Sequence, residues 1–553
     1  MDKLKPKLFS VLKNYSKEQL VKDVIAGIIV AIIALPLSIA LAIASGVNPE
    51  RGLYTAIIAG FFISFLGGSR VQIGGPTAAF VVIIYGIIEQ FGIDGLIVAT
   101  IMAGIFLVIM GLLRFGNLIK YIPYTITEGF TAGIAIGIFA GQIKDFLGLD
   151  MGAVPSEFLL KIQAYAKNIG TTNQMALLIG IISLAILIFW PKVTDKIPGS
   201  LIAIIATTLL VKFLKMDVNT IGSVYGELSS KFPTFSIPNV DVAMINKLIS
   251  PAFTIAILAG IESLLSCVVS DGMIGSKHRS NMELIAQGTG NIFSGLFGGI
   301  PATGAIARTA ANIKNGGRSP ISGMVHSVTL LAILLELMPA AGMIPMPTLA
   351  AILIMVAYNM CSWKEFFSLT KHAPKSDVLV LLVTFFLTVI FDLVVAIEIG
   401  LVLTALLFLK RMADVTNVES WTYQDERDED DIVDSDNINF KVVPKNTLVY
   451  EITGPMFFAA ADKFLEIETK SRNRANVIIV RMRSVPAMDV SALHTLRDVY
   501  ETCEKHGMHV IFSHVNPQPY KVMKKAGFIE QVGESNFKSN IDEALAYANE
   551  LAN

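Results

Sequence analysis

The chain has few charged residues and few cysteines for its length. Only 16% of its 553 residues are Asp, Glu, Lys or Arg, and the formal net charge is -1. A soluble protein of this size needs more polar surface, and an almost neutral chain has no overall field to attract a nucleic acid. The three cysteines, Cys267, Cys361 and Cys503, show neither a metal-ligand spacing nor a disulfide framework. These shortages argue against a soluble enzyme, a nucleic-acid-binding protein and a secreted disulfide-rich protein.

What the chain has in excess is apolar sequence. Hydrophobic residues make up 53% of it, and the mean hydropathy is +0.62. Residues 24–44 include no charged side chain, and about 20 mostly apolar residues suffice to cross a bilayer as a helix. Predicted spans lie at residues 24–44, 52–68, 74–89, 95–113, 123–141, 174–190, 198–213, 248–270, 283–297, 302–313, 319–338, 346–360, 377–392 and 395–410. The sequence therefore predicts a polytopic α-helical membrane protein with about 14 spans.

Basic residues predict how these spans are oriented. Lysines are frequent in the N-terminal segment, residues 1–23, and Lys and Arg otherwise fall mainly in short loops after even-numbered spans. Arg51, which follows the first span, is the short-loop exception. Because short cytoplasmic loops are rich in Lys and Arg, both termini are expected in the cytoplasm.

The spans form two sets with matching interruptions. The third span of the first set begins with Gly74-Gly75-Pro76-Thr77-Ala78, and the third of the second set begins near Gly298 and runs through Pro301 to Gly304. An odd number of spans per set inverts the second set in the membrane. Inverted repeats with broken helices at matching positions predict a secondary transporter whose site lies where the breaks meet. The alternative is that these are ordinary glycines and prolines of membrane helices.

Composition divides the chain into a membrane part and a soluble part. The predicted transport domain covers residues 24–412, and an acidic linker follows at 413–438. Residues 439–553 read as a small α/β domain, in which strands alternate with helices. The expected strands are 447–452, 476–482 and 508–513, and the expected helices include 459–471 and 489–505. Ser491, near the start of the latter helix, is expected to cap it.

Two ionisable residues lie deep in predicted spans, where charge is costly and usually functional. Glu262 and Ser266 are one helical turn apart on the same face. Their oxygens could hold a sodium ion, or the carboxylate could accept a proton. A structural ion pair within the bundle is the alternative for Glu262. His326, also within a predicted span, is either a packed, hydrogen-bonded residue or a proton relay.

Arg308 follows the second broken segment. Its planar group of donors suits carboxylates and oxyanions, and helix starts after Pro76 and Pro301 would add positive dipole ends. This arrangement predicts an anion site made of two half-helix N-termini and one arginine. In the alternative, Arg308 only neutralises Glu262.

These features resemble the SulP family of anion transporters over nearly the whole chain, including a C-terminal STAS domain. The segments that carry the resemblance are Leu35-Pro36-Leu37-Ser38-Ile39-Ala40 with Gly52-Leu53-Tyr54, Gly75-Pro76-Thr77, Ile261-Glu262-Ser263-Leu264-Leu265, and Gln287-Gly288-Thr289-Gly290-Asn291 with Gly298-Gly299. The likeness is greatest to the family's bacterial dicarboxylic acid transporters. It rests there on Ile143-Lys144-Asp145-Phe146-Leu147-Gly148-Leu149, Ala307-Arg308-Thr309-Ala310-Ala311-Asn312 and Gly454-Pro455-Met456-Phe457, among others.

The resemblance implies a fold, a site and partners. It implies a 7+7 inverted repeat with core and gate domains, a bacterial inner-membrane location, a homodimer and a STAS domain that could bind a cytoplasmic protein. It places the substrate between spans 3 and 10, and it matches Glu262 and Ser266 to the acidic and hydroxyl residues of sodium-coupled relatives. The substrate-binding residues that it implies are Thr77, Ala78, Gly304, Ala305, Ile306 and Arg308. Leu37 stands where many members have Gln or Glu, and Val490 and Ala492 replace the usual surroundings of a phosphorylated serine at Ser491.

The leading functional interpretation is a secondary active transporter of small anions, coupled to Na⁺ or H⁺ and moving its core against its gate like an elevator. A C4-dicarboxylate is the favoured substrate, and bicarbonate or sulfate is the alternative. A passive anion channel would share Arg308 without needing Glu262, and a signalling platform built on the STAS domain is a third interpretation. No cofactor is expected. If the coupling ion is sodium and not a proton, Glu262 and Ser266 are its expected ligands, and membrane lipid is an expected partner. No enzymatic activity is expected.

Overall fold

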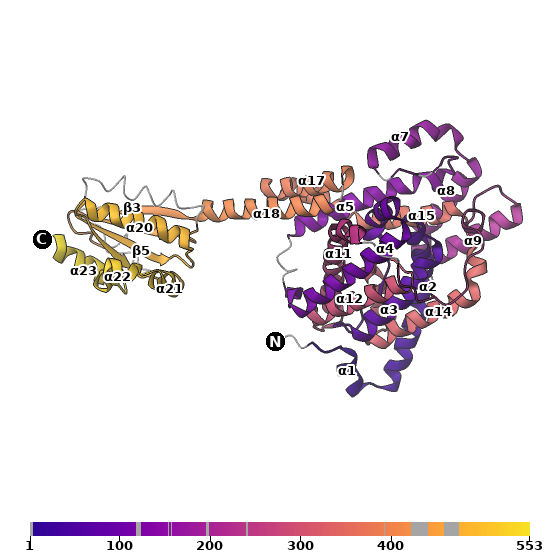
Figure 1. Ribbon diagram of the computed structural model, residues 1–553, viewed down its shortest axis with the longest axis horizontal. Helices are drawn as coiled ribbons and strands as arrows, with labels where there is room; N and C mark the ends of the chain where they lie inside the picture. The colour runs from indigo at the N-terminus through magenta and orange to yellow at the C-terminus, as the bar shows by residue number, and fades with distance from the viewer. Residues whose placement is uncertain are drawn as a thin grey trace. The chain divides into compact units, whose positions relative to one another are not determined.

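The computed structural model describes residues 4–117, 123–152, 154–155, 157–194, 198–238, 242–391, 393–421, 441–457 and 475–552. The chain forms two compact units, Met1–Leu401 and Val402–Asn553, which Figure 1 colours from indigo to yellow along the sequence. The acidic run 425–436 and the expected helix 459–471 lie outside the described residues.

Helices occupy every predicted span position of the first unit. In the first set they are α2 (Lys17–Ala44), α3 (Pro49–Leu66), α4 (Val81–Leu112), α5 (Tyr124–Gly141), α8 (Gln174–Phe189) and α9 (Gly199–Leu214). In the second set they are α11 (Val242–Ile274), α12 (Ser280–Leu296), α13 (Ile306–Lys314), α14 (Pro320–Ala341), α15 (Met346–Met360), α17 (Lys375–Ile390) and α18 (Leu393–Val415). Helix α4 covers two predicted spans and bends at Gly92, whose φ of 66° is not helical.

Many helices in the described part of the chain are candidates for crossing the membrane. There, 7 helices are long and apolar enough to cross a bilayer by themselves, among them those that include α2, α4 and α11. Shorter helices connect the spans: α1 (Leu8–Val11), α6 (Ile143–Leu147), α7 (Phe158–Asn168), α10 (Ile221–Tyr225) and α16 (Trp363–His372).

The helices of the first unit pack as a core group and a gate group. In the core, α12 packs on α3 and α4, α14 packs on α2 and α3, and α11 packs on α4. In the gate, α5 packs on α15 and α17, and α8 packs on α9 and α15. Gly104 of α4 and Gly288 of α12 allow a close approach within the core: a Cβ on either would meet the backbone oxygen of the other. Such small residues allow membrane helices to approach without a hydrophobic driving force.

The two predicted breaks meet as a short antiparallel sheet. Strand β1 (Gly74–Gly75) pairs with β2 (Thr303–Gly304), with Gly74 opposite Gly304 and Gly75 opposite Thr303. The predicted meeting of the two interrupted segments is thereby confirmed, and the starts of α4 and α13 are brought to one place in the core.

The C-terminal unit is a five-stranded sheet flanked by helices. Its strand order is β3 (Asn417–Trp421), β4 (Thr447–Thr453), β5 (Val477–Ser484), β6 (His509–Ser513) and β7 (Phe537–Lys538). The β3–β4 pair is antiparallel and the other pairs are parallel. The described helices are α20 (Val490–Lys505), α21 (Pro517–Lys525), α22 (Phe528–Val532) and α23 (Ile541–Ala552), which Figure 1 draws against the sheet. The predicted strands and the predicted helix 489–505 are confirmed.

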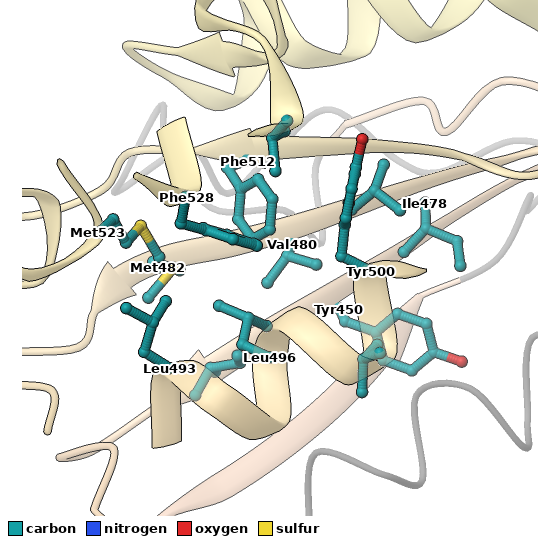
Figure 2. Packing of buried hydrophobic residues seen from close by; sticks show 14 of the residues in the cluster. Tyr450, Ile478, Val480, Met482, Leu493, Leu496, Tyr500, Phe512, Met523 and Phe528 are labelled. Carbon is teal, nitrogen blue, oxygen red and sulfur yellow. The ribbon is translucent and has the colours of Figure 1, made fainter. Parts of the chain in front are cut away.

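Alternation along the strands gives this sheet two buried faces. Ile478 and Val480 of β5 belong to a buried cluster with side chains of α20, α21 and α22, whereas Ile479 between them belongs to a second cluster with α23. Successive side chains of a strand point to opposite faces. In Figure 2, Leu493 and Leu496 of α20 point toward Val480 of the sheet. Helices on both faces are the usual arrangement for parallel strands.

Two details of the C-terminal half differ from the sequence-based expectations. Residues 417–421, expected in the acidic linker, form the edge strand β3, because their backbone pairs with β4. The cap of α20 is Asp489, whose side chain accepts a hydrogen bond from the amide of Ala492, and not Ser491. Ser491 lies one residue inside the helix with its side chain exposed.

Candidate functional site

The unwound backbone at the two breaks is stabilised by polar side chains of neighbouring helices. Asn291 of α12 donates to the carbonyl oxygen of Ala302 and accepts from the Ala302 amide, both at 2.8 Å. Asn312 of α13 donates to the carbonyl oxygen of Val71 at 2.9 Å. In a membrane, backbone groups outside helices must find partners within the protein, so these amides allow the breaks to exist.

Side-chain hydroxyl groups also form hydrogen bonds with the backbone of the two breaks. Thr55 accepts the amide of Ile300 at 2.7 Å, and Ser294 donates to the Ile300 carbonyl oxygen at 2.8 Å. On the other break, the hydroxyl of Thr309 accepts the amide of Ile73 at 3.0 Å. The site therefore rests on a rigid, hydrogen-bonded frame.

Two helix starts point into this frame. A 3₁₀ turn, Ala78–Phe80, leads into α4, and α13 begins at Ile306. The residues before them, Thr77 and Ala305, provide no side-chain cap. The first amides of a helix have no intrahelical acceptor and carry a partial positive charge, so both starts can receive an anion.

The structure brings together most of the residues predicted to contact substrate. Thr77 and Ala78 follow β1, and Gly304 ends β2 immediately before Ala305. Ala78 and Ala305 are buried, whereas the Ile306 side chain is 45% exposed. A Cβ on Gly304 would overlap the side-chain amide of Gln72, which explains why the second break has glycine there.

Arg308 lies behind the breaks and links them. Its side chain is buried, and Nη2 donates to the carbonyl oxygen of Pro76 at 2.8 Å. The other amino group, Nη1, has no hydrogen-bond partner among the described residues. A Cβ on Gly75 would contact Nη1, so the glycine makes room for the guanidinium. A buried cation with an unused donor is a favourable place for an anion.

Glu262 of α11 faces the start of the first half-helix. Its Oε2 accepts a hydrogen bond from the hydroxyl of Thr77 at 2.9 Å, and its side chain is partly exposed. No ion pair within 4.0 Å joins Glu262 to Arg308. The direct ion pair that the sequence analysis considered is therefore absent between these two described residues. The carboxylate is free of Arg308 to bind a cation, and the guanidinium is free of Glu262 to bind an anion.

Ser266 is not beside the Glu262 carboxylate. Its hydroxyl is 2.9 Å from Oε1 of Gln72 and 3.5 Å from the hydroxyl of Thr309, in a buried cluster below the breaks. The oxygen that the structure places next to Glu262 is that of Thr77. No group of three or more His, Cys, Asp or Glu side chains suited to a metal ion occurs among the described residues. Glu262 and Thr77 are thus the side chains that could hold a coupling cation, and the coupling roles of Glu262 and Ser266 stay predictions.

Several residues that support the two breaks are not predicted by the sequence analysis. Gln72, Asn291 and Thr309 are among them. The feature of the sequence that could have indicated them is a polar side chain within an apolar or glycine-rich segment. His326 is completely buried, and neither of its ring nitrogens has a hydrogen-bond partner in the described part of the chain. The structure therefore does not support the hydrogen-bonded arrangement considered for His326.

Known proteins share these features over nearly the entire sequence. The sulfate permease family matches residues 20–384, and the STAS domain matches residues 437–544. The chain is 40% identical over 533 residues to the putative sulfate transporter YvdB of Bacillus subtilis, covering 96% of this chain and 98% of that protein. It is 30% identical to the bicarbonate transporter BicA of Picosynechococcus, covering 95% and 94%.

Solved structures agree with the fold. The transmembrane domain of a cyanobacterial BicA superposes with a TM-score of 0.63 at 30% identity, covering 69% of this chain and 98% of that one. SLC26A9 superposes with a TM-score of 0.87 at 19% identity, covering 99% and 92%. The latter likeness concerns the fold alone.

Proposed function

The chain belongs to the sulfate permease (SulP) family and carries its STAS domain, and from this premise we propose that it is a secondary active, cation-coupled transporter of small oxyanions. Membership identifies a multi-pass membrane transporter and not an enzyme. The observation that carries the proposal is the convergence of two uncapped helix starts on Arg308, whose Nη1 is unpaired. The two helix starts and the Arg308 guanidinium supply the positive charge that an oxyanion needs at the middle of a membrane.

Coupling is proposed to operate through Glu262. A carboxylate deep in a membrane protein is costly unless it is protonated or paired. Its hydrogen bond to Thr77 links it to the same helix start that receives the anion. A sodium ion or a proton on Glu262 would therefore make that helix start more favourable for an anion, so cation and anion would move together.

The proposed movement is that of an elevator. The anion site is built entirely from core helices and their breaks, with Thr77 before α4, Glu262 on α11 and Arg308 on α13. Within the described part of the chain, no gate helix takes part in the hydrogen bonds that form it. The core could therefore carry its bound anion past the gate without dismantling the site.

The proposed substrate class is a small oxyanion. Relatives at 40% and 30% identity are named for sulfate and bicarbonate, which supports these anions as candidates. The C4-dicarboxylate favoured from the sequence stays a prediction, since Arg308 and helix starts suit carboxylates equally.

We further propose the cellular setting. The protein would lie in a bacterial inner membrane with both termini in the cytoplasm, in keeping with its bacterial relatives and its basic loops. It would form a homodimer, and its STAS domain would bind a cytoplasmic protein.

Transport into vesicles of the purified protein tests the proposal. Uptake of labelled sulfate, bicarbonate and succinate is measured under an imposed sodium gradient and, separately, a proton gradient. Accumulation of at least one anion above its equilibrium level, driven by one gradient, is the expected result. A conductive anion flux that depends on neither gradient would instead identify the protein as an anion channel. Absence of all three fluxes would contradict the proposed function altogether.

A further inference from the structure

A cavity of about 240 Å³ lies where core and gate helices meet. From the core it is lined by the end of α2 and the first turns of α4, from the gate by α5 and α15, and otherwise by the connecting helices α6, α7 and α10. It includes Lys144 and Asp145, from a segment of the chain that the central site does not use.

The cavity adjoins the proposed substrate site along α4. Val81, Val82 and Tyr85 line it, and Val81 is only three residues beyond Ala78, which corresponds to about 5 Å along a helix. The cavity also lies beside the ends of α2 and α5, remote in sequence from their cytoplasmic starts. With the N-terminus inside, it opens on the outer half of the path to the site.

Two lysines give the cavity its positive character. Lys144 donates to the backbone oxygen of Gly152 at 3.0 Å. The ammonium of Lys161 lies 5.8 Å from the centre of the Tyr85 ring, and Tyr85 is fixed by its hydrogen bond to the Val154 carbonyl oxygen. Neither ammonium is within 4.0 Å of a carboxylate oxygen of the described residues.

Lys161 has no ion-pair partner within 4.0 Å among the described residues, although it is half-buried. Its side chain is partly buried, and burial lowers its pKa because the charged form loses hydration. The carboxylate of Glu89, which forms no ion pair with it within 4.0 Å, offsets this loss only in part. Asp145 offsets one of the two lysine charges of the lining, which leaves one positive charge in excess. A small anion in the cavity would supply the missing partner.

We propose that this cavity is a second, outer anion site at which an incoming oxyanion binds Lys161 and Lys144 before it reaches the helix starts. The proposal rests on the proposed transport function and adds its entry step. Pockets for drug-sized ligands measure about 300 to 1,000 Å³, so the volume restricts the ligand to a small anion with its water. A lysine held over a ring at the entrance would raise the local anion concentration, and Coulomb steering acts on the rate of encounter.

The experiment compares transport from the two faces of the membrane. Sulfate, bicarbonate and succinate uptake is measured with Lys161→Gln in right-side-out and in inverted vesicles. We expect a KM for entry from the outer face raised about threefold or more, a kcat close to wild type, and an unchanged KM from the inner face. High salt should reduce the difference between variant and wild type, since salt screens charges. Lys161→Arg should restore the KM.

Lys167→Gln is the matched control, because Lys167 is an exposed lysine of the same helix and does not line the cavity. An unchanged outer KM in Lys161→Gln, or an equal rise on both faces, would overturn the outer site while leaving the transport function intact. Loss of all uptake in the wild type would instead refute the proposed function.

A second measurement needs no variant. A membrane-impermeant amine reagent is applied to the wild-type protein, and mass spectrometry follows the modification of Lys161 and Lys167. Sulfate should slow the modification of Lys161 and leave that of Lys167 unchanged. Equal rates for Lys161 with and without sulfate, bicarbonate and succinate would also reject the site.

Discussion

The guanidinium of Arg308 donates a hydrogen bond of 2.8 Å to the carbonyl oxygen of Pro76, 232 positions earlier in the chain. One charged side chain thus joins the broken segments of the two repeats. It also keeps one amino group, Nη1, without a partner among the described residues. The arginine therefore makes one structural contact and keeps one donor that the proposed anion could use.

Replacing Arg308 should separate the structural contact from anion binding. Arg308→Gln keeps a neutral hydrogen-bond donor but removes the charge, so folding should persist while anion affinity falls. Hydrogen bonds to charged groups contribute about 1.5 to 3 kcal/mol, which corresponds to an affinity about ten- to a hundredfold weaker. Uptake kinetics in proteoliposomes measure the change, and thermal unfolding in detergent measures the fold. Arg70→Ala, at an exposed arginine, is the control, and wild-type uptake by Arg308→Gln would exclude Arg308 from the anion site.

Glu262→Gln should uncouple transport. The amide preserves the shape of the side chain and an acceptor for the Thr77 hydroxyl, but it needs neither a cation nor a proton. Gradient-driven accumulation should disappear, whereas exchange of anion at equilibrium should continue. Accumulation is measured under sodium and proton gradients separately, and exchange is measured with labelled anion on one side.

Thr77→Val serves as the companion of Glu262→Gln, because it removes the hydroxyl and keeps the carboxylate. If Glu262 binds the coupling cation together with Thr77, this variant should require a higher cation concentration for half-maximal uptake. Wild-type accumulation by Glu262→Gln under either gradient would assign the carboxylate a structural role.

The close contact between α4 and α12 should tolerate no added methyl group. A Cβ on Gly104 would meet the Gly288 carbonyl oxygen, whereas a Cβ on Gly86 of the same helix meets nothing within 4 Å. Overpacking of a well-packed interior costs about 1 to 3 kcal/mol. Gly104→Ala should therefore lower the Tm of the purified protein, and Gly86→Ala should not. Equal Tm values for the two variants would show that α4 and α12 can move apart without cost.

The start of α20 should depend on Asp489 and not on Ser491. Asp489 accepts the amide of Ala492 at 2.8 Å, whereas the exposed Ser491 lies inside the helix. Loss of an N-cap costs about 1 kcal/mol, so Asp489→Ala should accelerate amide exchange in the first turn about fivefold. Hydrogen–deuterium exchange of the full-length protein measures this effect, with Ser491→Ala as the control. Faster exchange in Ser491→Ala than in Asp489→Ala would reverse the assignment of the cap.

Much of the architecture could be predicted from the sequence because its cause is local. A long apolar run such as residues 24–44 has one stable solution in a bilayer, a helix that satisfies its own backbone. Two adjacent glycines followed by a proline, as at residues 74–76, disfavour a continuous helix at that point through the local backbone alone. The family motifs around Glu262 and Asn291 identified the fold for the same reason, since each belongs to one short segment.

The partners of buried polar groups could not be predicted, since they come from remote parts of the chain. Sequence spacing placed Ser266 on the same helix face as Glu262, but a hydroxyl binds whichever polar atom packing brings nearest. That atom belongs to Gln72, 194 positions away. The same holds for the cavity beside Lys161, which exists only because α4 and α7 pack near each other. Thus the sequence by itself determined the helices, their breaks and the family, whereas tertiary packing alone decided which polar atoms meet, because burial obliges each to find a partner that the local chain does not provide.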